Sequence, residues 1–166
     1  MKTITRSKRT KAIVERAAKV FVEYFDCDLS DITADCRVKE TRILNTKRHG
    51  AAGCCFGKTI YIVPIANGFF TDDDLEKVSK NLFNTVIHEL VHIYQDKSGE
   101  FEGWEEVNDY RDRAIEIHAF DAAGYISAAE RVKRGEIGQE LFDKCFCKEM
   151  LTSERAKEKS LAKRAV

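Results

Sequence analysis

The chain has 166 residues and a mass of 19.0 kDa, the size of one ordinary globular domain. It contains 28 basic and 28 acidic residues, so its formal net charge is zero, which excludes a surface that is basic throughout, as in many nucleic-acid-binding proteins. No run of residues is apolar enough for a membrane span or for the core of a signal peptide. We therefore expect a cytoplasmic protein with a single domain over residues 1–166 and with its six cysteines reduced.

The first third of the chain predicts one helix followed by short strands. A helix is expected over residues 8–25, where apolar residues recur at helical spacing: Ala12, Ile13, Ala17, Val20, Phe21 and Tyr24. Two runs of β type follow, residues 36–44 and 58–63, with a glycine-rich turn between them and Pro64 after the second.

The rest of the chain predicts helices. One should begin near residues 71–74, with Thr71 as its N-cap, and continue to about Gln95, before Ser98 and Gly99. Another is expected over 107–133, followed by a break at residues 135–138 and one or two charged helical segments, the last in a basic tail of about 152–166. The pattern predicts an α+β fold with a small sheet.

The third region carries the motif H-E-x-x-H as His88, Glu89 and His92. Histidines four apart project from the same side of a helix, so both imidazoles can bind one zinc ion, and the glutamate can deprotonate the metal-bound water. One broad half of this helix is apolar, whereas both histidines lie on the opposite half with Asn81, Asn84 and Gln95. The helix should pack its apolar half on the core and form the floor of a cleft with its polar half.

A catalytic zinc site needs a third protein ligand, and the next helix offers Glu116 and His118. These residues are about 200° apart around a helix, so they cannot both reach one ion. Glu116 shares its face with small residues, Ala119, Ala123 and Ser127, which would allow a close approach to the first helix. We therefore favour Glu116 over His118 as the third ligand.

With His88, Glu89 and His92 on one helix and Glu116-Ile-His-Ala119 on the next, the chain resembles the zincin metallopeptidases, and more narrowly their gluzincin branch. The resemblance covers residues 58–125, and in size the chain is similar to small phage-type or SprT-like HExxH proteins. It implies a zincin-like fold in which the strand Lys58 to Val63 is the edge strand that holds an extended peptide. The glycine of the metzincin motif is replaced by Gln95.

The function that we predict is a zinc-dependent metallopeptidase, in which Glu89 activates a metal-bound water for attack on a peptide bond. The oxyanion donor is left open among Tyr110, Arg113, His118 and Tyr125. One alternative is a metal-binding protein with a zincin fold but no proteolytic activity. A second is a hydrolase of a non-peptide amide, similar to peptide deformylases.

The cysteines bear on the second alternative. In the deformylase-like case, Cys54 or Cys55 would supply the third ligand. Cys54-Cys55 and Cys145-x-Cys147 could also form a second zinc site, although neither pair has the usual C-x-x-C spacing, and buried free thiols are the simpler interpretation. Iron or manganese could occupy the histidine and carboxylate ligands in place of zinc.

The zero net charge conceals an uneven distribution. Residues 1–11 hold five basic residues and no acid, and residues 152–166 hold five bases against two acids. Residues 72–116, which bear the predicted site, hold thirteen acids against five bases. If this acidity surrounds the cleft, it predicts a protein or peptide substrate that is preferably basic. The basic ends could contact nucleic acid, but neither a nucleic-acid partner nor a membrane partner is expected.

Overall fold

The computed structural model describes residues 1–37, 53–63, 72–104 and 109–164. They form a mixed α+β structure with five α-helices and a four-stranded sheet in the described part of the chain. The chain divides into two compact units, an N-terminal unit of Met1–Ile93 and a C-terminal unit of Tyr94–Val166, so the boundary falls inside one long helix. The expectation of a single domain over residues 1–166 stays a prediction.

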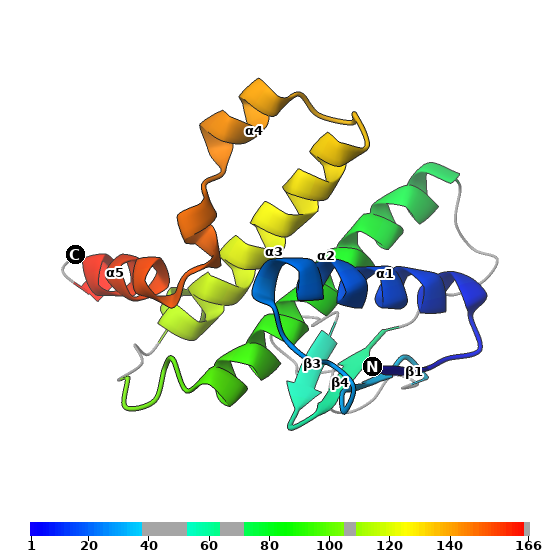
Figure 1. The fold of residues 1–166 in the computed structure, drawn as a ribbon, viewed down its shortest axis with the longest axis horizontal. Coiled ribbons are helices and arrows are strands. Elements are labelled where there is room, and N and C mark those ends of the chain that lie inside the picture. The colour runs from blue at the N-terminus through cyan, green and yellow to red at the C-terminus, as the bar shows by residue number, and fades with distance from the viewer. Residues whose placement is uncertain (38–52, 64–71, 105–108, 165–166) are drawn as a thin grey trace. The chain divides into compact units, whose positions relative to one another are not determined.

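The N-terminal unit begins with strand β1 (Lys2–Ile4), helix α1 (Lys8–Phe25) and strand β2 (Thr33–Asp35) (Figure 1). The predicted helix over residues 8–25 is confirmed with the same bounds. Its N-cap is Ser7, whose Oγ accepts a hydrogen bond of 3.1 Å from the Thr10 backbone N–H. The apolar face of α1 is buried, whereas β1 and β2 are too short to produce a strand pattern in the sequence.

The sheet of this unit has the strand order β1-β2-β4-β3, with β3 (Gly53–Phe56) and β4 (Thr59–Ile62) forming a hairpin. β1, β2 and β4 are parallel neighbours, and β3 runs antiparallel to β4. The two-residue turn begins at Gly57, which has a φ of +53°, as the first central residue of a type II′ turn requires.

The hairpin corrects one expectation about the sheet. β4 lies within the predicted run of residues 58–63, but it pairs with β2 on one side and β3 on the other, so Lys58 to Val63 is not an edge strand. Among the described strands, the two edges are β1 and β3. Two parallel strands on the far side of β4 account for the difference, and short strands of this kind leave little trace in the sequence. Residues 38–44 of the other predicted run lie outside the described residues.

Helix α2 (Asp72–Ser98) continues from the N-terminal unit into the C-terminal unit. It begins and ends close to the predicted residues, whereas its predicted N-cap, Thr71, lies outside the described residues. Its apolar side is buried as expected, at Leu82, Phe83, Val86, Ile87, Leu90 and Ile93. In the N-terminal unit, the Arg16 guanidinium of α1 lies over the Phe83 ring, 4.8 Å from its centre.

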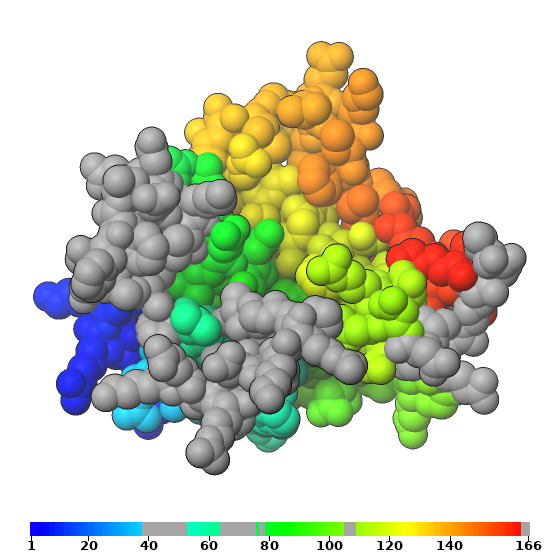
Figure 2. Space-filling view, turned by 180° about the vertical axis from the view of Figure 1, so that it is seen from behind, coloured from blue at the N-terminus to red at the C-terminus, as the bar shows by residue number. Residues whose placement is uncertain are grey.

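The C-terminal unit contains the short 3-10 helix η1 (Tyr110–Asp112), α3 (Ala114–Lys133), α4 (Gln139–Cys145), η2 (Lys148–Leu151) and α5 (Ser153–Arg164). α4, η2 and α5 all pack against α3, as the orange and red atoms beside the yellow ones show (Figure 2). The predicted basic tail of about 152–166 therefore includes a helix. Its Lys159 donates a hydrogen bond of 2.5 Å to Asp121 of α3.

The predicted helix over 107–133 is wrong at its start, because α3 begins at Ala114 and Arg113 before it is extended. A tertiary contact explains the difference. The Asp112 carbonyl, which a continuous helix would use internally, accepts a hydrogen bond of 2.7 Å from Ser160 Oγ of α5. Residues 105–108 lie outside the described residues.

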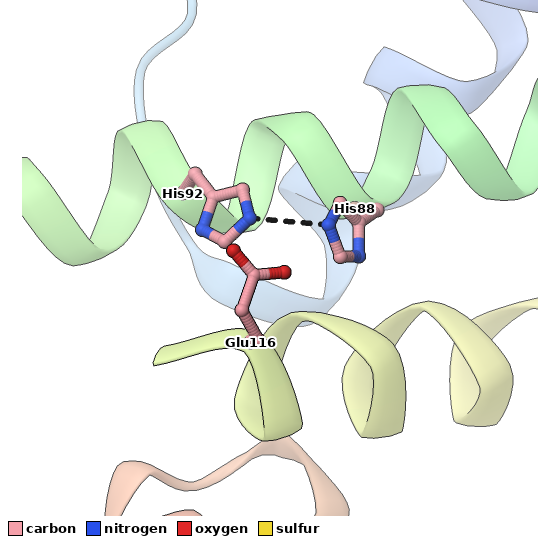
Figure 3. A group of neighbouring side chains, drawn as sticks. All are labelled: His88, His92 and Glu116. Carbon is pink, nitrogen blue, oxygen red and sulfur yellow. Dashed lines mark hydrogen bonds between the residues drawn. The ribbon is translucent and has the colours of Figure 1, made fainter. Parts of the chain in front are cut away.

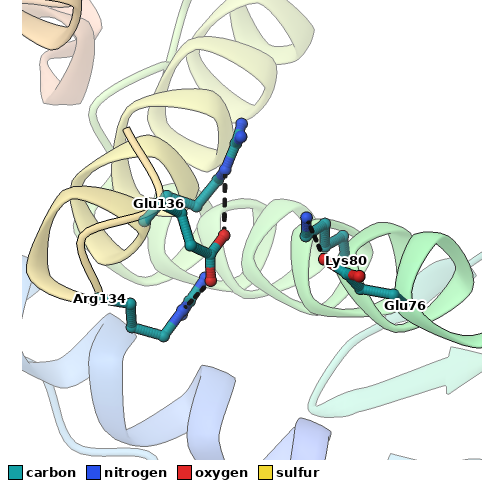
Figure 4. Close-up of polar contacts among 5 residues, drawn as sticks. Glu76, Lys80, Arg134 and Glu136 are labelled. Carbon is teal, nitrogen blue, oxygen red and sulfur yellow. Dashed lines mark hydrogen bonds and ion pairs between the residues drawn. The ribbon is translucent and has the colours of Figure 1, made fainter. Parts of the chain in front are cut away.

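The predicted break after this helix is confirmed at Gly135. The Gly135 N–H donates to Val132 O, the Glu136 N–H donates to Arg131 O, and Gly135 has a φ of +70°, which together make a Schellman C-cap. Glu136 also pairs with Arg131 and Arg134, and within α2 Glu76 pairs with Lys80; Figure 4 draws both groups. Among the described helices, none has the length and apolar character that crossing a membrane requires.

Candidate metal centre

Helix α2 presents both histidines of the H-E-x-x-H motif from one side. His88 and His92 are half-buried, and their Nε2 atoms lie 3.1 Å apart with the two rings at 90°. Two nitrogens that bind one tetrahedral zinc ion at about 2.0–2.1 Å are roughly 3.3 Å apart. The helix therefore already holds the two imidazoles at nearly the separation that one shared ion requires.

Glu116, in the first turn of α3, completes a group of three side chains that could hold a metal ion. His88, His92 and Glu116 each offer one ligand atom, and these atoms all lie within 4.8 Å of one another (Figure 3). Glu116 is only 6% exposed. A buried carboxylate is costly unless a cation or hydrogen-bond donors compensate it, and two imidazoles with one carboxylate form a familiar catalytic zinc set.

His118, the alternative third ligand, forms hydrogen bonds with other groups. It is fully buried, its Nε2 lies 3.0 Å from the Leu151 carbonyl oxygen, and its Nδ1 lies 3.1 Å from Gln95 Nε2. Burial lowers the pKa of His118, because desolvation disfavours the charged imidazolium. Both ring nitrogens are thus used in hydrogen bonds, and the structure groups Glu116 with the two histidines in preference to His118.

Gln95 corrects the predicted polar half of α2. We expected it beside the histidines on the surface of a cleft, but it is only 2% exposed and donates a hydrogen bond of 2.8 Å to the Ile115 carbonyl. No pattern in the sequence indicates this role, since a glutamine three residues after a histidine is equally compatible with solvent. The contact requires the first turn of α3 to lie next to Gln95, and this tertiary arrangement has no local sequence pattern.

Glu89, the predicted general base, is buried against strand β3. It is 6% exposed, and a Cβ atom placed on Gly53 would lie 3.2 Å from its Oε1. The Cys55 side chain forms a hydrogen bond with Glu89, and burial together with this carboxylate raises the pKa of Cys55 to about 12. The thiol therefore stays protonated and can donate to the carboxylate.

The cysteines do not enter the group of three ligands. All six are free thiols, and the group that could hold a metal in the described residues contains no sulfur. Burial also raises the pKa of Cys54, to about 11, with a further contribution from the Glu89 charge. A ligand role for Cys54 or Cys55, as in the deformylase-like alternative, finds no support in this geometry.

The candidates for the oxyanion donor are separated by their surroundings. The Tyr125 ring lies 5.3 Å from the Phe142 ring, and both side chains are buried. Tyr110 is 46% exposed, and the Arg113 guanidinium lies 5.9 Å from the centre of its ring. With His118 used by its two hydrogen bonds, Tyr110 and Arg113 are the candidates whose surroundings are compatible with contacting a substrate.

Comparisons with protein-family models, with curated proteins and with solved structures found no match to this chain. The functional argument therefore depends on the motif and on the geometry of the side chains.

Proposed function

We propose that this protein is a zinc-dependent peptidase with a zincin-like fold, in which His88, His92 and Glu116 hold the metal and Glu89 is the general base. The observation that carries the proposal is the convergence of these three ligand atoms within 4.8 Å of one another. Two histidines from H-E-x-x-H and a glutamate from a later helix are the donor set that leaves a fourth zinc position open.

When bound, a zinc ion supplies Lewis-acid chemistry, since it polarises a carbonyl and makes water more acidic. Glu89 follows His88 directly in the chain and is buried, so little water screens its charge. Its carboxylate accepts a proton from the attacking water and then transfers that proton to the leaving amine. The hydrogen bond from Cys55 holds one side of this carboxylate.

Strand β3 is suited to holding the peptide. It is the last strand of the described sheet, and Gly53 brings its backbone close to Glu89. An extended peptide that pairs with β3 would lie with its backbone near the general base. The excess of acids in residues 72–116, thirteen against five bases, favours basic peptides as substrates, and cleavage of such peptides should weaken as salt is added.

The test combines metal content with peptide hydrolysis. We expect the protein purified without chelator to contain about one zinc per chain and to cleave peptides from a library that includes basic sequences. Glu89→Gln should retain the metal and lose roughly 10²–10⁴-fold in kcat, because general base catalysis is removed while the ligands stay. Glu158→Gln, at an exposed position of α5, is the matched control and should behave as the wild type.

The outcomes separate the three functions considered from the sequence. A Glu89→Gln variant that cleaves as fast as the wild type would contradict the assignment of the base. Bound metal without cleavage of any peptide or amide would favour a binding protein, and cleavage of formylated amines alone would favour deformylase-like chemistry. Iron or manganese in place of zinc would correct the metal but leave the ligands. A metal-free protein would refute the proposal.

A further inference from the structure

A network of buried hydrogen bonds in the C-terminal unit connects the end of α2, the start of α3 and the end of η2. Gln95 Nε2 lies 2.8 Å from Ile115 O and 3.1 Å from His118 Nδ1, and His118 Nε2 lies 3.0 Å from Leu151 O. Gln95 is 2% exposed and His118 is fully buried. The network therefore joins three segments that are far apart in sequence, in surroundings where an unsatisfied polar group is costly.

The chemistry of these groups determines which atom donates in each hydrogen bond of this network. The Leu151 carbonyl can only accept, so His118 carries its proton on Nε2 and donates it there. Nδ1 is then an acceptor, and the Gln95 amide donates one of its two protons to it and the other to Ile115 O. A neutral imidazole fits this arrangement, because Nδ1 accepts a hydrogen bond and only Nε2 carries a proton.

The two contacts of Gln95 lie on either side of Glu116 in the chain. One is to the backbone of the residue before it, and the other is to the side chain two residues after it, so Gln95 holds the start of α3 at two points. Through its other ring nitrogen, Nε2, His118 also connects this part of α3 to the Leu151 carbonyl at the end of η2. The residues on either side of Glu116 are thus held by hydrogen bonds of their own.

We infer that Gln95 and His118 are positioning residues, which set the affinity and geometry of the metal centre by holding the turn of α3 that carries Glu116. The inference depends on the proposed metal site but not on peptidase activity. Hydrogen-bonded neighbours that orient metal ligands commonly contribute 10-fold to 100-fold in metal affinity. Here Gln95 and His118 would act on metal affinity indirectly, through the backbone of α3, which carries the ligand Glu116.

The test uses variants of the full-length chain that remove or retain the donor and acceptor of residue 118. His118→Leu removes both, whereas His118→Gln retains one donor and one acceptor in its amide. Gln95→Met removes both donors on the side of α2 and serves as an independent variant if His118→Leu does not fold. Ile126→Ala, a buried position farther along α3, is the control for a general loss of stability.

Zinc affinity is measured by competition with a chromophoric chelator, and ligand geometry by the visible absorption of the cobalt-substituted protein. We expect His118→Leu and Gln95→Met to bind zinc about 10-fold to 100-fold more weakly and to change the cobalt spectrum. His118→Gln should recover most of the affinity, and Ile126→Ala should retain the wild-type spectrum despite lower stability.

Wild-type affinity and an unchanged cobalt spectrum in folded His118→Leu and Gln95→Met would overturn the inference, because the network would then be structural only. The same changes in Ile126→Ala would also overturn it. If these variants weaken zinc binding while the wild type cleaves no peptide, the peptidase proposal fails and the positioning role is supported. A wild type without metal affinity would refute both.

Discussion

At Gly53, strand β3 lies so close to the helix that carries the motif that an added Cβ would clash, so we expect Gly53→Ala to destabilise the N-terminal unit. An added Cβ would lie 2.6 Å from Thr85 Cγ2, 3.2 Å from Glu89 Oε1 and 3.3 Å from Glu89 Cγ. Thr85 cannot simply rotate away, because it is β-branched and its hydroxyl donates a hydrogen bond of 2.9 Å to the Asn81 carbonyl.

The magnitude follows from two opposing effects. Overpacking by one methyl group in a tight interface costs about 1–3 kcal/mol. Replacing glycine by alanine in a strand gains roughly 0.5–1 kcal/mol, because the unfolded chain has less conformational freedom to lose. Taking the middle of each range, we expect the free energy of unfolding to fall by roughly 1 kcal/mol in Gly53→Ala.

A double-mutant cycle with Thr85→Ser, followed by urea unfolding, identifies the cause. Serine retains the hydroxyl and removes the Cγ2 methyl group, so the pair Gly53→Ala with Thr85→Ser should recover roughly 1 kcal/mol relative to the sum of the single changes. A Gly53→Ala protein as stable as the wild type would refute the close approach of β3 to α2. A loss of stability that Thr85→Ser does not relieve would refute the assignment of the clash to that methyl group.

Further predictions concern the thiols, the start of α3 and acid stability. Cys145 is exposed and should react first with a thiol reagent. Cys36 should react only after unfolding, since it is 1% exposed and burial raises its pKa to about 12. Mass spectrometry measures the two rates of modification, and equal rates would contradict this prediction. Ser160→Ala removes the hydrogen bond to the Asp112 carbonyl and should lower the free energy of unfolding by about 1–3 kcal/mol. Urea unfolding measures this, and an unchanged midpoint would contradict a stabilising role for the hydrogen bond. The pKa of His118 is lowered from 6.5 by burial, so as the pH falls below 6.5 the unfolded chain binds a proton that the folded chain does not. Stability should decrease from pH 6.5 down to the folded pKa and then level off, and this decrease should be absent from the His118→Gln protein.

The sequence predicted the elements that depend on local periodicity and capping. α1 has the predicted bounds because its apolar positions recur every three or four residues and Ser7 can cap it. The break after α3 was predicted because glycine readily takes the positive φ that a C-cap needs. The histidine pair was predicted for the same kind of reason, since two residues four apart on a helix meet whatever the rest of the chain does.

Other features were decided by contacts between segments that are distant in the sequence. α3 begins at Ala114 because Ser160 takes the Asp112 carbonyl, and β4 lies inside the sheet because two parallel strands pair beyond it. Neither contact can be recognised from a local sequence pattern. The first depends on a single hydroxyl, that of Ser160, and the second on strands β1 and β2 of only three residues each.

The zero net charge and the H-E-x-x-H motif could be read directly from the chain, and the motif alone determined that two imidazoles lie on one side of a helix. Only the tertiary structure groups Glu116, and not His118, with the two histidines, because both residues belong to the same turn of α3 and both are buried, so the sequence does not distinguish them. Gln95 and the Leu151 carbonyl form hydrogen bonds with the two ring nitrogens of His118, whereas the carboxylate of Glu116 lies in the group with the histidines.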